Sequence, residues 1–306
     1  MTIYQHITEF AGLPVVNFEP AMELPADPTA VAWRIATGYD SDEVFPKLVE
    51  LFLAAVDPAA VRALVVGSWD DPFDTPPPVD LLVSLAPRLT NLRALFLGEM
   101  TFEECEISWI QQGDVTALLT AYPALEVLRV RGAEELVLTS VRHTALRELA
   151  FESGGLPGTV VRAVGECDLP ALRHLELWLG SPNYRGDATI DDLAPILAGT
   201  RLPALRYLGL RDAQIADEVA AAVAVAPVVA RLETLDLSLG TLGDEGAAAL
   251  LAGQPLTHLR RLDLHHHFVD RELADRLTAE LVGVDVDLSD PQQPDEDGDR
   301  YVAVSE

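Results

Sequence analysis

The chain has 306 residues, of which 49% are hydrophobic, and a formal net charge of −28. This composition excludes a disordered protein, because the chain carries enough apolar side chains to form a core. The acidic excess repels phosphate backbones, so nucleic acid is not expected as a partner. The N-terminal residues lack a signal-peptide pattern and there is no apolar run of about 18 residues, which predicts a cytosolic protein without membrane contact.

The N-terminal residues 1–60 are less regular than the rest of the sequence. The alternation of Val31, Trp33 and Ile35 predicts a strand, and residues 42–56 have the apolar spacing of a helix. We interpret this region as an irregular N-terminal cap, because a terminal repeat would otherwise expose its apolar layer.

From residue 61 onward an L-x-x-L-x-L pattern recurs, with first apolar positions at 61, 92, 125, 146, 172, 205, 232 and 259. Helical patterns separate the copies, at 80–89, 114–121, 159–167, 191–198, 217–229, 244–252 and 270–281. A strand followed by a helix, repeated in this way over 61–281, predicts one α/β leucine-rich repeat solenoid. We expect about eight repeats in a right-handed horseshoe, with parallel strands on the concave face and helices on the convex face.

Residues 282–306 follow the last repeat. Alternating apolar residues at 284–288 and 301–304 flank the acidic stretch 289–299, and they predict a hairpin of two strands that caps the C-terminal end. The order of Asp295, Asp297, Gly298 and Asp299 differs from that of a calcium-binding loop, so we expect an acidic tip.

The repeats resemble the ribonuclease-inhibitor-like class of leucine-rich repeats, most clearly in LDLSLGTLGDEGAAALLAGQPLTHLRRLDL at 235–264. The stretches FLGEMTFEECEISWIQQGDV, LWLGSPNYRGD, RRLDLHHH and RYVAVSE, at 96–115, 177–187, 260–267 and 300–306, are similar to a family of bacterial cytosolic leucine-rich repeat proteins that has a locus-tag name. This resemblance implies the fold over the whole chain and implies no activity.

Strand alternation places the third, fifth and seventh positions of each L-x-x-L-x-L-x copy on the concave face. These positions are small and apolar in the N-terminal third and charged or aromatic in the remainder. We expect Trp178 and Arg131 to anchor a partner there, since Trp and Arg dominate interface hot spots. The alternative is a solvated face whose opposite charges pair with one another. The predicted concave contacts are Arg129, Arg131, Glu152, Glu176, Trp178, Arg211, Asp236, Asp263 and His265.

Asp236 and Asp263 occupy the same position in neighbouring repeats, so their carboxylates are expected side by side. With Glu176 and His265 they suggest a site for a divalent cation or for an arginine of a partner. Screening by water, salt or Arg261 is the alternative. The run of histidines at 265–267 lacks a metal-ligand spacing, and we expect these side chains to hydrogen-bond to the next turn.

Two steps between repeats exceed the period of 27 residues by six, and the extra length falls at 98–112 and 179–187. Insertions in solenoids form loops on one rim, and these two carry Trp109 and Tyr184. Both residues are predicted partner contacts, although Trp109 could instead fill the space beneath its own loop.

Cys105 and Cys167 have no Cys-x-x-Cys spacing, which indicates free thiols in a reducing compartment. Motifs for nucleophilic catalysis, nucleotides or other cofactors are absent from the sequence, so it predicts no enzyme and no cofactor. We therefore predict a protein-interaction scaffold that binds a protein or peptide of mixed, somewhat basic charge. The alternatives are a metal- or small-ligand-binding protein, or an enzyme, centred on the concave carboxylates and His265, and a structural subunit of a larger assembly.

Overall fold

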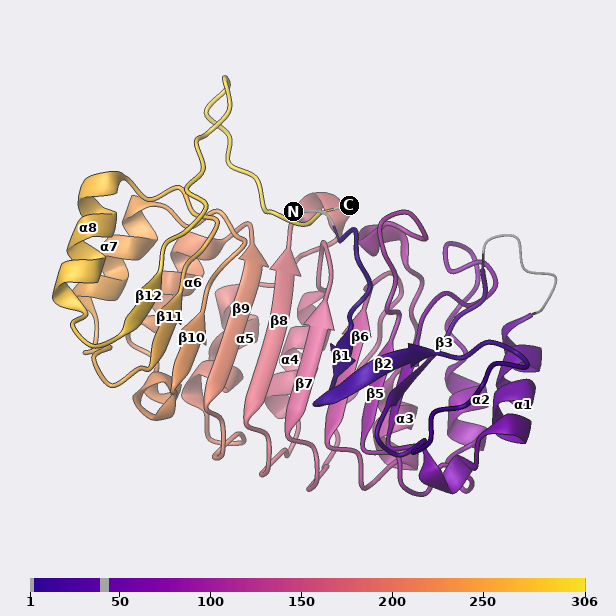
Figure 1. Cartoon of the computed structure of the whole chain (residues 1–306). Coiled ribbons are helices and arrows are strands. Elements are labelled where there is room, and N and C mark those ends of the chain that lie inside the picture. Colours follow the sequence, from indigo (N-terminus) through magenta and orange to yellow (C-terminus); the bar gives the residue numbers. More distant parts are fainter. Residues whose placement is uncertain (1–2, 39–43, 306) are drawn as a thin grey trace.

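The computed structural model describes residues 3–38 and 44–305. Within these residues the strands form one curved sheet of 12 strands, which follow one another in chain order (Figure 1). Neighbouring strands from β2 to β12 are parallel, and β1 runs antiparallel to β2. Helices cover one side of the sheet, as the repeats predict, so the chain is an α/β leucine-rich repeat solenoid.

The strands are β1 (Glu9–Phe10), β2 (Leu13–Asn17), β3 (Ala32–Ile35), β4 (Ala63–Val66), β5 (Ala94–Leu97), β6 (Val127–Arg131), β7 (Glu148–Glu152), β8 (His174–Gly180), β9 (Tyr207–Ala213), β10 (Thr234–Asp236), β11 (Arg261–Asp263) and β12 (Asp285–Asp287). The helices are α1 (Phe45–Ala55), α2 (Val79–Ser84), α3 (Thr116–Ala121), α4 (Gly158–Glu166), α5 (Ile190–Ala198), α6 (Ala216–Val223), α7 (Asp244–Ala252) and α8 (Arg271–Glu280). Short 3₁₀ helices are η1 (Pro58–Ala60), η2 (Ile107–Trp109), η3 (Pro182–Tyr184) and η4 (Pro227–Arg231).

Each predicted helix of the repeats has a counterpart, but α2 ends at Ser84 and not at 89, and the predicted helix 217–229 is divided into α6 and η4. The predicted helix 42–56 begins outside the described residues, and its described part is α1. Within the repeats, the prediction of a helix after every strand is wrong in one place, because residues 132–147 between β6 and β7 contain no helix. The step between these repeats, 21 residues, is the shortest of the series. Within the part of the chain that is described, no helix is long and apolar enough to cross a membrane.

The core lies between the sheet and the helices. The leucines at the centre of the repeats, such as Leu128, Leu175 and Leu208, are fully buried. Helix ends follow from local sequence: Thr189 and Asp192 form a capping box at α5, and Asp270 caps α8 by accepting a hydrogen bond from the Leu273 amide at 2.8 Å. Side-chain caps therefore mark the starts of α5 and α8, whereas the N-cap residues of the other described α-helices form none.

The N-terminal segment, residues 3–17, folds back over the apolar third of the concave face (Figure 1). Phe10 of β1 packs on Phe96 of β5, with ring centroids 5.7 Å apart. Ala63 and Ala94 are buried beneath the same cover. The small side chains of this third, which the sequence places on an open surface, are therefore the floor of an internal contact.

The predicted C-terminal hairpin, residues 282–306, is wrong. Its first part forms β12, which pairs parallel to β11 and extends the sheet. Residues 301–305 form no strand and run back along the rim toward the N-terminal segment. We call residues 300–305 the final segment. Val304 packs there against Ile107, Trp178 and Leu239, and this apolar contact is available only on the rim, not beside β12.

Candidate functional site

The concave side chains form rows across the sheet, with the predicted register. One row runs from Val127 through Glu148, His174 and Tyr207 to Thr234. The next row contains Arg129, Ala150, Glu176, Gly209, Asp236 and Asp263. Strand alternation and the repeat period are therefore sufficient to predict which residues share this surface.

The charges of these rows are satisfied within the chain. Arg129 pairs with Glu148 at 2.9 Å and with Glu152 at 3.0 Å. Arg131 pairs with Glu152 at 2.8 Å and lies over the ring of Phe96, 5.2 Å from its centroid. Because Arg131 and Glu152 are both buried, the prediction of Arg131 as an exposed anchor is wrong.

Arg211 bridges the two carboxylates that flank Gly209. Its guanidinium contacts Glu176 at 2.7 Å and Asp236 at 3.3 Å. Burial alone would raise the pKa of Glu176, but the hydrogen bond with His174 and the charges of Arg211 and Arg129 hold that pKa below its usual range. The charges in the middle of the concave face thus pair with one another, although the buried Nε of Arg129 has no hydrogen-bond partner among the described residues.

Trp178 is 8% exposed, so the prediction of an open binding side chain is wrong. Its indole N–H donates to Glu176 at 2.7 Å, and Arg211 lies 5.2 Å from the ring centroid. Val304 of the final segment packs in the same apolar cluster. The chain covers this tryptophan with its own residues, which the repeat pattern alone does not indicate.

The proposed metal ligands do not come together as one set. Asp236 and Asp263 are register partners, as predicted, but Arg211 binds the first carboxylate and Arg261 the second, at 2.9 Å. Among the described residues, a compact group of possible ligand atoms is formed by Asp263, His265 and Asp287, all within 4.8 Å of one another. Hydrogen bonds to Arg261 and His265 already occupy Asp263, so this group carries no argument for a metal.

Of the histidines at the end of β11, His267 hydrogen-bonds to the next turn, as predicted, whereas His265 bonds to Asp263 of its own strand. His265 Nδ1 lies 2.6 Å from Asp263, and His267 Nε2 lies 3.1 Å from the carbonyl of Leu288 in the next turn. The hydrogen bond to Asp263 raises the pKa of His265, whereas burial lowers the pKa of His267.

The hydrogen bond between His265 and Asp263 predicts that the stability of the fold depends on pH. Protonated His265 stabilises the folded state, so its contribution to the free energy of unfolding is full below pH 6.5 and is lost as the pH rises through its raised pKa. In an NMR titration His265 should have a midpoint above 6.5. Asp263→Asn should lower that midpoint, and the exposed Asp275→Asn in α8 should leave it unchanged. A midpoint at or below the ordinary histidine value would contradict the prediction.

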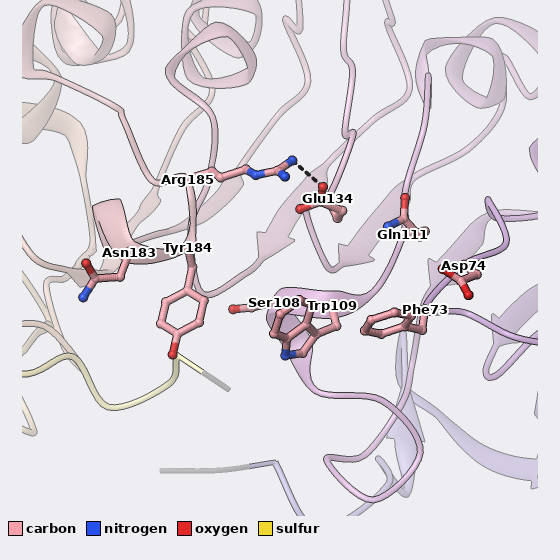
Figure 2. A pocket seen from close by; sticks show the side chains of 9 residues that line it. All are labelled: Phe73, Asp74, Ser108, Trp109, Gln111, Glu134, Asn183, Tyr184 and Arg185. Carbon is pink, nitrogen blue, oxygen red and sulfur yellow. Dashed lines mark hydrogen bonds and ion pairs between the residues drawn. The ribbon is translucent and has the colours of Figure 1, made fainter.

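A pocket of about 340 Å³ lies on the rim at the carboxyl ends of the strands (Figure 2). We call it the rim pocket. It is lined by Phe73, Asp74, Ser108, Trp109, Gln111, Glu134, Asn183, Tyr184 and Arg185. The two insertions that the sequence indicates thus meet in one site, together with residues from the loops after β4 and β6.

Phe73 and Trp109 form an exposed aromatic pair in the rim pocket. They are 49% and 47% exposed, with ring centroids 5.4 Å apart and planes tilted by 30°. Trp109 does not fill the space beneath its own loop, which was the alternative. Its indole N–H donates to Glu106 at 2.7 Å, so the ring is oriented by its own loop.

The loops meet because the turns between them are short and rich in glycine. Gly155 and Gly180 form an antiparallel bridge, and Gly180 has a φ of +67°. A Cβ atom at Gly154 would collide with Ser108, and one at Gly155 would collide with the carbonyl of Tyr184. Only residues without a side chain let the loops after β5 and β8 close on each other.

Sequence reasoning missed Phe73, Asp74 and Glu134 as members of the site. The signal available for the first two was the step of 31 residues between the repeats at 61 and 92, which also exceeds the clean period. Glu134 lies within the shortest repeat, and its role depends on Arg185, with which it forms an ion pair (Figure 2).

The repeats, the parallel sheet and the helices behind it define a leucine-rich repeat solenoid. Comparison with protein-family models and with curated protein sequences gives no match. Among solved structures, a Bacteroides fragilis protein determined by a structural genomics consortium has a TM-score of 0.79 at 28% identity, over 89% of this chain and 76% of that chain. An internalin from Listeria monocytogenes has a TM-score of 0.45 at 16% identity, over 87% of this chain and 63% of that chain.

Proposed function

We propose that this protein is a non-enzymatic interaction scaffold that binds a protein or peptide of mixed, somewhat basic charge through its rim pocket. The observation that carries the proposal is the exposed pair of Phe73 and Trp109 beside Tyr184. Exposed aromatic side chains grouped on rigid loops are typical of binding sites. The charge of −28 favours a basic partner.

The rim is a better candidate than the concave face. The concave arginines and carboxylates already pair with one another, so a partner would have to break these contacts before making its own. The N-terminal segment and the final segment cover further parts of that face. We therefore restrict the predicted partner footprint to the rim pocket. In this proposal Arg129, Arg211 and Asp263 stabilise the concave face through ion pairs within the chain and do not contact the partner.

The finer classification is part of this proposal. A full helix behind most strands supports the ribonuclease-inhibitor-like class of repeat. The thiols of Cys105 and Cys167 are free, which supports a reducing cytosol. Burial, and then the carboxylates of Asp71 and Glu106, raise the pKa of Cys105 to about 12, which disfavours the thiolate form.

The test compares recovery of partners from a lysate of the source organism. Wild-type protein and the Phe73→Ala/Trp109→Ala variant serve as baits, with Val225→Ala as the control because Val225 is an exposed apolar residue outside the rim pocket. A protein retained by wild type and by the control is then purified. We expect the double variant to bind it at least about tenfold more weakly in calorimetry. Equal affinity for all three baits would overturn the proposal.

A further inference from the structure

The rim pocket places aromatic faces and carboxylates around one space. Figure 2 shows Phe73 and Trp109 side by side, Tyr184 on the other side of Ser108, and Arg185 and Glu134 toward the neighbouring loops. The aromatic rings supply flat apolar surface with negative electrostatic potential on their faces. Such faces attract cations more strongly than they attract neutral or anionic groups.

The charges around the rim pocket favour a cation as well. Asp74 and Glu134 belong to the lining, and Glu106 and Glu135 lie next to it. The cation in the lining, Arg185, is neutralised by contacts with Glu134 and Glu135, the latter at 3.6 Å. The net charge around the rim pocket is therefore negative, as is the net charge of the whole chain.

The rings are held before any ligand arrives. The hydrogen bond to Glu106 orients the Trp109 indole, and Phe73 packs on that ring. Because Gly155 has no side chain, the backbone of Tyr184 can pack directly against it. The contact between Arg185 and Glu134 shows that the geometry of this rim accommodates a guanidinium beside a carboxylate. A pre-organised aromatic surface next to a carboxylate suits arginine best, because its planar group stacks and forms paired hydrogen bonds.

We propose that the rim pocket binds the side chain of an arginine in the partner, with the guanidinium against the aromatic pair of Phe73 and Trp109 and paired with Asp74, which Figure 2 shows beside Phe73. This inference rests on the proposed function and names the chemistry that the partner must present. It requires an accessible peptide segment, since a pocket of about 340 Å³ holds one side chain and not a folded surface.

The test uses the full chain and the indole N–H signals of its four tryptophans. Trp33, Trp69 and Trp178 are buried, so Trp109 is the one that a ligand in solution can reach. Trp109→Phe assigns its cross-peak. The probes are N-acetyl-arginine amide, its neutral isostere N-acetyl-citrulline amide, and N-acetyl-aspartate amide, which tests for an anion on Arg185.

We expect the arginine probe to shift the Trp109 signal saturably, in the millimolar range, while the other three signals stay in place. Asp74→Asn should weaken that binding about threefold, whereas the exposed Asp275→Asn in α8 should not change it. Unchanged buried indole signals in Asp74→Asn show that the variant is folded. Equal shifts with citrulline, binding of the aspartate probe alone, or no shift would overturn the inference.

The two proposals fail separately. If the arginine probe does not bind but the Phe73→Ala/Trp109→Ala variant still loses its partner, the interaction scaffold stands and the arginine assignment is wrong. If the probe binds and that variant keeps its partner, the pocket accepts arginine but the partner uses another surface, and the proposed function at the rim is wrong.

Discussion

Glu99→Ala is expected to lower the free energy of unfolding by about 3 kcal/mol, because it breaks a buried ion pair and leaves Arg34 without its main partner. Glu99 is 0% exposed and accepts hydrogen bonds from Arg34 Nε at 2.7 Å and from the Ile7 amide at 3.0 Å. His6 Nδ1 lies 3.0 Å from the same carboxylate. Glu99 thus holds the N-terminal segment against the concave face.

The measurement is urea unfolding followed by tryptophan fluorescence, since Trp33 and Trp69 lie in the N-terminal repeats. Glu103→Ala, an exposed carboxylate of the same loop, is the matched control. Replacing both partners, as in Arg34→Met/Glu99→Met, should cost less than Glu99→Ala because no buried charge remains unpaired. A Glu99→Ala variant as stable as Glu103→Ala would contradict this account.

Val304→Asp is expected to detach the final segment and expose Trp178. Val304 is 2% exposed, and its amide donates to Asp212 at 3.0 Å. Burial raises the pKa of Asp212 well above its usual range. Among the described residues its Oδ2 has no hydrogen-bond partner. A second carboxylate beside it, in an apolar cluster, is expected to cost about 3 kcal/mol, so the segment dissociates.

Detachment is measured by tryptophan fluorescence in a Trp109→Phe background, which removes the signal of the exposed tryptophan. The three remaining tryptophans are buried, and only Trp178 is expected to become exposed. We expect a red shift of the emission and stronger quenching by acrylamide. Val282→Asp, at an exposed valine just after α8 and outside the apolar cluster of Val304, should change neither signal. Unchanged quenching in Val304→Asp would mean that the final segment does not protect Trp178.

The outcome for the candidate residues differs between the sheet and the rim. The alternation of Arg129, Glu176 and Asp236 predicted their shared face, since it depends on neighbouring repeats. The pairing of these charges within the chain was the alternative to a partner footprint. The same alternation predicted Trp178 to be open, and it is covered. That cover comes from Val304, which follows it by more than four repeats of sequence and has no periodic relation to it.

The rim shows the same division. Insertion lengths located Trp109 and Tyr184 on one edge of the solenoid, but not the distance between them. Whether two loops three strands apart meet depends on the curvature of the sheet and on the short turns at Gly154 and Gly155. The curvature of the sheet also brings Phe73 into the rim pocket, and the length of its loop was only a weak signal in the sequence.

The sequence by itself determined the repeat, the strand register and the residues that share a face, because these follow from local periodicity and nearest-neighbour stacking. Only the tertiary structure decided that the N-terminal segment covers part of the concave face, that the final segment covers Trp178 from the rim, and that the rim loops enclose a pocket. These features depend on contacts such as His6 with Glu99, 93 residues apart, and Ser108 with Ser305, 197 residues apart. Such contacts are selected by the shape of the folded solenoid and not by any pattern along the chain.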